Sequence, residues 1–207
     1  MKELDAVLDR IDRDLDQSIE RLFSFLRIQS ISTDPAYKAQ CKAAADFVAA
    51  DLKSIGFAAE VRPTEGHPIV VGKAGENAVN PASKGKAPHV LFYGHYDVQP
   101  VDPLELWERP PFEPRIENGR LYARGAADDK GQVHLHAWAA RAWLAVEGKL
   151  PVNVRYVFEG EEESGSEHFE RWIDENRHRL GADLVVVSDT GFFQGNQPAI
   201  TVGLRGL

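Results

Sequence analysis

The chain has 207 residues, 43% of them hydrophobic and 27% charged, which is typical of one globular domain and excludes a disordered or fibrous protein. Lys and Arg number 24 against 32 Asp and Glu, a formal net charge of -8, so nucleic acid is not expected as a partner. Residues 1–13 alternate charged and apolar side chains, so we expect no signal peptide, no membrane interaction, and a soluble, cytoplasmic protein.

Two helices are predicted in the amino-terminal part of the chain. Apolar residues recur at spacings of three and four through residues 4–26, which predicts one long amphipathic helix that ends near Ser30. A second helix is expected over residues 37–55, closed by Gly56 in a left-handed conformation. Cys41 lies on the apolar stripe of this second helix. We therefore interpret this single cysteine as a core residue, with a reactive thiol as the alternative.

Two short β-like runs follow, at residues 58–61 and 69–71. The next segment, residues 75–88, is rich in Gly, Pro, Asn, Ser and Lys and has no periodicity, which predicts a surface loop. We expect the strands on either side of this loop to be neighbours in a sheet.

From Val90 onward the chain alternates predicted strands and helices. The strands are expected at residues 90–93, 152–158 and 184–187, and the helices at residues 130–147 and about 166–180. Such alternation predicts an α/β fold with a mostly parallel sheet flanked by helices.

Two local signals refine these elements. Asn118-Gly119, between Arg115-Ile116 and Leu121-Tyr122, predicts a hairpin turn inside the long loop that follows the first of these strands. Ser164 and Glu167 have the spacing of a capping box, which predicts that the last helix begins near Ser166.

Potential metal ligands follow the three predicted strands at the points where the strands end. They are His95 with Asp97, the run Glu159–Glu163, and Asp189. In an α/β sheet the carboxyl ends of parallel strands share one edge, so we expect these groups to meet there. Asp128-Asp129, between a Gly-containing loop and the helix from Lys130, is expected near the same edge.

One His with several carboxylates suits zinc, and also manganese or cobalt. Ionised carboxylates in one water-poor pocket raise each other's pKa unless cations neutralise them, and two divalent ions would do so. The alternative is that Glu161-Glu162-Glu163 is a solvated acidic turn and Asp128-Asp129 a helix cap. Each motif taken alone favours that alternative.

Nucleophilic catalysis is not favoured. Ser188 has no Gly-x-Ser-x-Gly sequence around it, and Cys41 has no catalytic neighbours. His134 and His136 are two positions apart on a helix, so they cannot bind one ion from the same face. The remaining histidines are interpreted as surface or structural residues: His67, His89, His168 and His178.

Taken together, the motifs resemble a known family. Gly94-His95-Tyr96-Asp97-Val98-Gln99-Pro100 is followed by Ala123–Gly131, by Glu159–Ser166, by Ser188-Asp189 and by Pro198–Gly206. This order and spacing resemble the zinc amidohydrolase family of carnosinases, aminoacylases and acetylornithine deacetylase. The Asp-Asp-Lys-Gly form and the segment from Tyr93 through Trp107 to Pro114 resemble its dipeptidase branch.

The resemblance implies a ligand set for two zinc ions. Asp128 would bridge them, His95 and Asp189 would complete the protein ligands of one ion, and Glu163 would belong to the other. The resemblance also implies a cis peptide bond between Asp128 and Asp129.

Two further residues receive roles from the resemblance. Glu162 would be the general base, and Asp97 would hold the far ring nitrogen of His95 and so fix its tautomer. The implied reaction is metal-dependent hydrolysis of an amide or peptide bond in a dipeptide or an N-acyl amino acid. A zinc-activated water would attack, and Glu162 would take its proton and deliver it to the leaving amine.

Members of this family are usually far longer than 207 residues. Residues 1–207 are therefore expected to be the amino-terminal part of the catalytic, metal-binding domain. The lid or dimerisation domain, through which a full-length parent could form a homodimer, and the carboxyl-terminal part of the catalytic domain are expected to be absent. No His follows His178, so the partner of Glu163 on the second zinc is also expected to be missing.

Four functional alternatives stay open. The chain could belong to a dipeptidase-like hydrolase, or to a deacylase of the acetylornithine or succinyl-diaminopimelate type. It could instead be a truncated zinc-binding domain without turnover, or a metal-free interaction domain.

Overall fold

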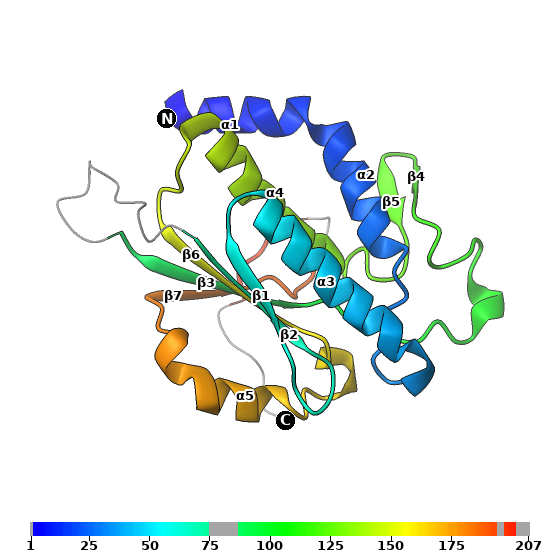
Figure 1. The fold of residues 1–207 in the computed structure, drawn as a ribbon. Helices are drawn as coiled ribbons and strands as arrows, with labels where there is room; N and C mark the ends of the chain where they lie inside the picture. Colours follow the sequence, from blue (N-terminus) through cyan, green and yellow to red (C-terminus); the bar gives the residue numbers. More distant parts are fainter. Residues whose placement is uncertain (1, 75–86, 194–196, 202–207) are drawn as a thin grey trace.

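The computed structural model describes residues 2–74, 87–193 and 197–201. A central β-sheet has helices on both faces, with α3 and α4 on one face and α5 on the other (Figure 1). The α-helices are α1 (Lys2–Arg13), α2 (Leu15–Leu26), α3 (Lys38–Ser54), α4 (Lys130–Glu147) and α5 (Phe169–Asn176). Short 3-10 helices are η1 (Pro35–Tyr37), η2 (Leu104–Leu106), η3 (Glu162–Ser164) and η4 (Arg177–Arg179).

Within the described residues, none of the helices combines the length and apolar character that a membrane crossing needs. The cytoplasmic location stays a prediction.

The strands of the described residues form one large sheet and one hairpin. The large sheet contains β1 (Ala58–Arg62), β2 (Ile69–Ala74), β3 (His89–His95), β6 (Asn153–Glu159) and β7 (Leu184–Val187). The hairpin consists of β4 (Arg115–Glu117) and β5 (Arg120–Tyr122). Asn118 and Gly119 join its strands with φ angles of 52° and 74°, which confirms the predicted turn.

The large sheet has the order β1-β2-β6-β3-β7 among the described residues. β3 is parallel to both β6 and β7, whereas the β1–β2 and β2–β6 pairs are antiparallel. The predicted α/β class with flanking helices is confirmed, and the sheet is mixed, with its parallel part confined to β3, β6 and β7.

The expectation that the strands on either side of residues 75–88 are neighbours is wrong, because β6 lies between β2 and β3. Residues 75–86 of that predicted loop lie outside the described residues.

The amino-terminal helix differs from the prediction of one long helix. It is broken at Asp14, where φ is -97° and ψ is 12°, and α2 ends at Leu26 instead of near Ser30. α1 and α2 run in different directions, and both contact α4 (Figure 1). The apolar periodicity continues through the break because both helices bury a face against the same domain, so the pattern does not reveal the change of direction.

The predicted capping box of the last helix is wrong. α5 begins only at Phe169, His168 makes no side-chain cap hydrogen bond, and Ser164 Oγ donates instead to Glu161 O at 3.1 Å. Ser164 belongs to the η3 turn, which ends at Gly165 and Ser166 with left-handed φ angles of 96° and 54°. This turn uses the serine that the sequence pattern assigned to the helix.

The core lies between α3, α4 and the sheet. Phe25, Leu52 and Phe158 are fully buried there, and so is Cys41. Burial raises the pKa of the Cys41 thiol to about 12, which agrees with its interpretation as a core residue. Gly56 closes the second predicted helix with a φ of 89°.

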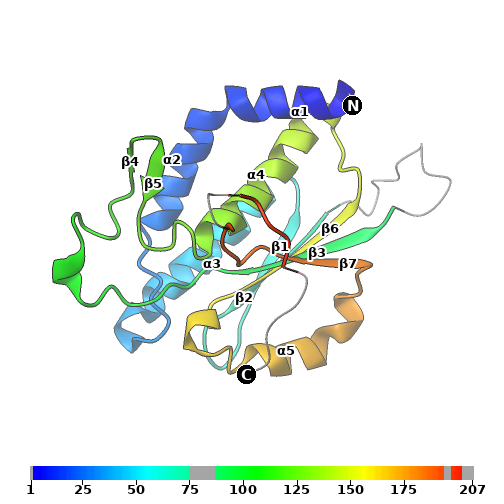
Figure 2. The ribbon, with the colours of Figure 1, turned by 180° about the vertical axis from the view of Figure 1, so that it is seen from behind.

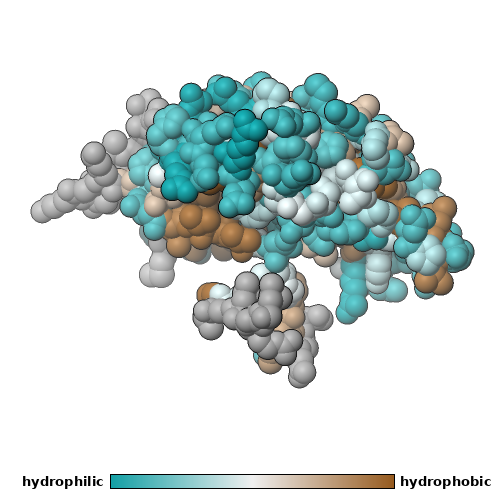
Figure 3. Space-filling model, turned by 90° about the horizontal axis from the view of Figure 1, so that it is seen from below, coloured by the Kyte–Doolittle hydropathy of each residue, from teal (hydrophilic) through white to brown (hydrophobic). Residues whose placement is uncertain are grey.

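Strand β7 forms one edge of the described sheet and is strongly apolar. Leu184, Val185 and Val187 are each between 53% and 56% exposed. Seen from below, most of the surface is hydrophilic, with hydrophobic residues exposed in separate patches (Figure 3). A continuous apolar run is typical of strands that are buried on both faces, so β7 is less covered than its sequence leads one to expect.

Candidate metal centre

The parallel part of the sheet brings the predicted site residues to one edge. β3 ends at His95, which is paired with Glu159 at the end of β6, and β7 ends two residues before Asp189. Asp128-Asp129 precedes the first turn of α4, and Asp129 Oδ2 accepts a hydrogen bond from His95 N at 3.1 Å. The peptide bond between Asp128 and Asp129 is cis, as the resemblance implied.

The outer ring nitrogen of His95 faces three carboxylates. His95 Nε2 lies 3.0 Å from Asp128 Oδ1, 3.6 Å from Asp189 Oδ2 and 3.8 Å from Glu162 Oε2. One ligand atom from each of His95, Glu162 and Asp189 lies within 4.8 Å of the other two. This group could hold a metal ion.

The inner nitrogen of His95 faces Asp97, and both side chains are fully buried. Nδ1 lies 3.1 Å from Asp97 O and 3.3 Å from Asp97 Oδ1. The other carboxylate oxygen of Asp97 accepts a hydrogen bond from Glu163 N at 3.1 Å. Asp97 therefore connects the imidazole to the backbone of the Glu162-Glu163 segment.

The pKa values of the site residues are shifted because several carboxylates surround one buried imidazole. Burial lowers the pKa of His95, but the hydrogen bond and charge of Asp97, with the charges of Asp129 and Glu162, outweigh burial and raise it to about 10. Burial also raises the pKa of Glu162, and it raises that of Asp129 to about 7. The site thus favours additional positive charge.

The donor set fits a divalent cation. Asp129 Oδ1 and Glu159 Oε2 are buried near this edge and have no hydrogen-bond partner among the described residues, so the carboxylates there exceed the donors that this part of the chain supplies. An imidazole nitrogen and carboxylate oxygens within 4.8 Å of one another are ligands that zinc, manganese and cobalt accept.

Glu163 lies outside the group around His95. Its Oε2 accepts a hydrogen bond from Gln99 Nε2 at 2.6 Å, and burial raises its pKa. Asp128 is more exposed than His95, with a side-chain exposure of 59%. The structure brings Asp128, Asp189 and Glu162 to His95, whereas the assignment of individual metal and catalytic roles to them, and of a second metal to Glu163, stays a prediction.

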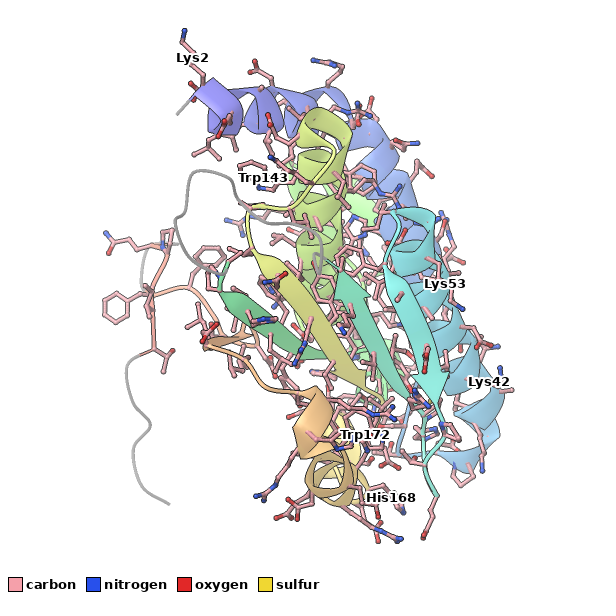
Figure 4. The ribbon with its side chains drawn as sticks, turned by 60° about the vertical axis from the view of Figure 1, so that its left-hand side comes forward. Lys2, Lys42, Lys53, Trp143, His168 and Trp172 are labelled. Carbon is pink, nitrogen blue, oxygen red and sulfur yellow. The ribbon has the colours of Figure 1, made fainter. Side chains whose placement is uncertain are left out.

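Glu161 has a structural setting that the sequence did not reveal. It is 7% exposed and accepts backbone hydrogen bonds from His67 at 3.0 Å and His168 at 3.3 Å, and its Oε2 lies 3.0 Å from His168 Nδ1. His168 lies beside Trp172 of α5 on the lower side of the sheet (Figure 4). A Cβ at Gly66 would lie 1.7 Å from Glu161 Oε1, so only glycine leaves room for this carboxylate. Glu161 thereby anchors the turn that carries Glu162, and His67 and His168 are structural, as expected.

Lys130 is a second residue whose position the sequence did not predict. It is fully buried, and its Nζ donates to Ile28 O at 2.6 Å and to Phe25 O at 3.3 Å. Burial lowers its pKa to about 7. These bonds attach the start of α4, and with it Asp128, to the end of α2. The Asp-Asp-Lys-Gly motif was the available signal, but it gave no partner for the ammonium group.

Comparison with known proteins gives a consistent result. The family model described as Peptidase family M20/M25/M40 matches residues 91–203. The chain is 34% identical over 217 residues to the Cys-Gly metallodipeptidase dug1 of Schizosaccharomyces pombe. The aligned segment covers 99% of this chain and 44% of the relative. Among solved structures, human carnosine dipeptidase 1 has a TM-score of 0.82 at 29% identity, over 91% of this chain and 41% of that one.

A further solved structure has a different activity in its name. The M20 family metallo-carboxypeptidase Sso-CP2 from Sulfolobus solfataricus has a TM-score of 0.75 at 36% identity, over 87% of this chain and 39% of that one. The chain therefore spans less than half the length of these relatives. The family model matches more than half of the chain, and the sheet edge gathers the motif residues, so the chain belongs to the peptidase family M20/M25/M40 and resembles its dipeptidases.

Proposed function

We propose that this chain carries the metal-binding part of a dipeptide-hydrolysing site and that zinc is its metal. The observation that carries the proposal is the convergence of His95, Glu162 and Asp189 within 4.8 Å, with Asp128 3.0 Å from the same imidazole. The names of two relatives, a Cys-Gly metallodipeptidase and a carnosine dipeptidase, support a dipeptide as the substrate. An N-acyl amino acid has the same amide bond next to a carboxylate and is the alternative substrate.

His95, Asp128 and Asp189 would hold the first zinc, and Asp128 with Glu163 would contribute to a second. When bound, zinc polarises the scissile carbonyl and lowers the pKa of water. Manganese or cobalt would suit the same donors. We propose that residues 1–207 are the amino-terminal part of a catalytic domain, because the relatives extend over more than twice the matched length.

Glu162 would act as the general base and acid. Its Oε2 lies 3.8 Å from His95 Nε2, beside the position where His95, Asp128 and Asp189 converge. Burial raises the pKa of Glu162 above its usual value, which brings it closer to the pH at which one carboxyl group can both accept and release a proton. Glu162 would take a proton from the attacking water and deliver it to the leaving amine.

Asp97 would orient the imidazole. When a metal ion replaces the proton on Nε2, a carboxylate at Nδ1 favours the tautomer that carries its hydrogen there, so that Nε2 would be free to bind the ion beside the three carboxylates. Because Asp97 also accepts the Glu163 N–H, it would hold His95 and the Glu162-Glu163 segment in a fixed relation.

A zinc-binding unit without turnover is the second candidate. One observation favours it: Glu163 hydrogen-bonds Gln99 and lies outside the group around His95 within the described residues. Such a unit would bind one zinc tightly through His95, Asp128 and Asp189, and a second zinc weakly.

Calorimetry with the metal-free chain tests the proposal. We expect one tight zinc site and one weaker site, loss of the tight site in His95→Ala, and its retention in the control His178→Ala, whose side chain is exposed on η4. Release of amino acids from Cys-Gly, β-Ala-His or an N-acetyl amino acid with added zinc would support the hydrolase. Tight zinc binding without release from any of them would support the second candidate. Equal zinc binding by the wild type and His95→Ala would refute both.

A further inference from the structure

A cavity of about 850 Å³ opens directly beside the candidate metal centre. Asp128 and Asp189 form one side of it, so the cavity and the metal centre share two carboxylates. Figure 2 shows this side of the molecule, with the segment after β7 near α4. The volume lies in the range of small-molecule sites.

Large apolar side chains from four separate parts of the chain line the rest of the cavity. They are Leu22 of α2, Leu121 of β5, Leu135 of α4 and Phe192 after β7. Leu135 is 61% exposed and Phe192 is 71% exposed, so both offer apolar surface that the described part of the fold does not cover. Uncovered apolar side chains grouped around a concave site are typical of ligand-binding surfaces.

Two polar side chains of the lining, those of Gln132 and Ser188, already have partners. Gln132 Nε2 donates to Ala127 O at 2.5 Å, and Ser188 Oγ lies 2.8 Å from His136 Nε2. The lining contains no Lys, Arg or His among the described residues. When zinc is bound it neutralises Asp128 and Asp189, and the described lining offers no further cationic side chain that could pair with an acidic ligand group. Desolvation of such a group without a partner is unfavourable.

We propose that this cavity receives an uncharged apolar side chain of the substrate. The side chain belongs to the residue that contributes the carbonyl group of the scissile bond. The inference rests on the proposed function, because a carbonyl bound at the metal centre places its neighbouring side chain beside Asp128 and Asp189. The site accordingly favours dipeptides with a branched aliphatic or aromatic residue at this position over those with glycine or an acidic residue.

Calorimetry of three zinc-binding probes on the zinc-loaded chain tests this preference without requiring turnover. The probes are the hydroxamates of glycine, leucine and aspartic acid, which share the metal-binding group and differ in side chain. We expect leucine hydroxamate to bind about tenfold or more tightly than glycine hydroxamate, because burial of the isobutyl group is favourable. Aspartate hydroxamate should bind more weakly than either.

Two variants test whether the preference for leucine hydroxamate arises in this cavity. Leu135→Lys should abolish the advantage of leucine hydroxamate and strengthen aspartate hydroxamate, each measured relative to glycine hydroxamate on variant protein saturated with zinc. Leu8→Lys, at a 49% exposed leucine of α1 away from the cavity, should keep the wild-type order. Equal affinity for the three probes on a chain that binds zinc would overturn this inference and leave the proposed metal site intact. Absence of zinc binding would overturn both.

Discussion

Acidification is expected to destabilise this fold through His134 of α4. The side chain is 6% exposed, and its Nε2 lies 2.9 Å from Ser18 Oγ on α2. Burial lowers the pKa of His134 from 6.5 to about 4. The imidazole is therefore neutral in the folded protein at pH values where it is protonated in the unfolded chain.

The sign and size of the effect follow from this difference. Between pH 6.5 and about 4 the unfolded chain binds a proton that the folded chain does not, so the free energy of unfolding is highest above pH 6.5 and falls as the pH drops toward 4. The complete effect of one such histidine is about 3 kcal/mol, of which about 2 kcal/mol is present at pH 5. His136, whose pKa burial also lowers to about 4, adds an effect of the same sign.

Urea unfolding at pH 7.5 and pH 5.0 measures the effect, with a chelator in every sample so that metal release does not contribute. His134→Gln can keep a hydrogen bond to Ser18 but takes up no proton. We expect the wild type to lose about 2 kcal/mol more than His134→Gln between the two pH values. His178→Gln, at the exposed histidine of η4, should show the wild-type loss. If wild type and His134→Gln lose the same free energy, the reasoning from burial is wrong.

Three further predictions concern the site and its support. Glu162→Gln should retain zinc but remove most turnover in a chain that hydrolyses dipeptides, and a parallel loss of zinc would contradict its assignment as the base. Gly160→Ala places a Cβ 2.2 Å from the buried Tyr96 hydroxyl and should lower the free energy of unfolding by about 1–3 kcal/mol. Gly181→Ala, whose added Cβ meets no atom of the described residues within 4 Å, should change the free energy of unfolding by less than about 0.5 kcal/mol in the same urea titration. Zinc should raise the melting temperature of the wild type and leave that of His95→Ala unchanged, and an equal rise in both would place zinc elsewhere.

The sequence located the candidate site because its residues follow strands. His95 and Asp189 each come after a short apolar run, and parallel strands end at a common edge, so their proximity was predictable without coordinates. α4 was predicted with its observed bounds, Lys130–Glu147, and in the structure Gly148 closes it with a left-handed φ of 67°.

Contacts between distant segments were not predictable in this way. The burial of Glu161 depends on His67, more than ninety residues earlier, and on the space left by Gly66. In the sequence Glu161 looks like its neighbours Glu162 and Glu163, because three consecutive glutamates give no indication of which one turns inward.

The sequence by itself determined the class of the fold, most helix and strand positions, and the group of residues that meet at the sheet edge. These depend on local periodicity and on motif order, which a single chain contains. Only the tertiary structure decided that β6 separates β2 from β3, that the first helix breaks at Asp14, and that Lys130 donates to Phe25 in the last turn of α2 and to Ile28 just after it. Periodicity reports which face of an element is buried, but the partner of that face is selected by packing across the whole domain.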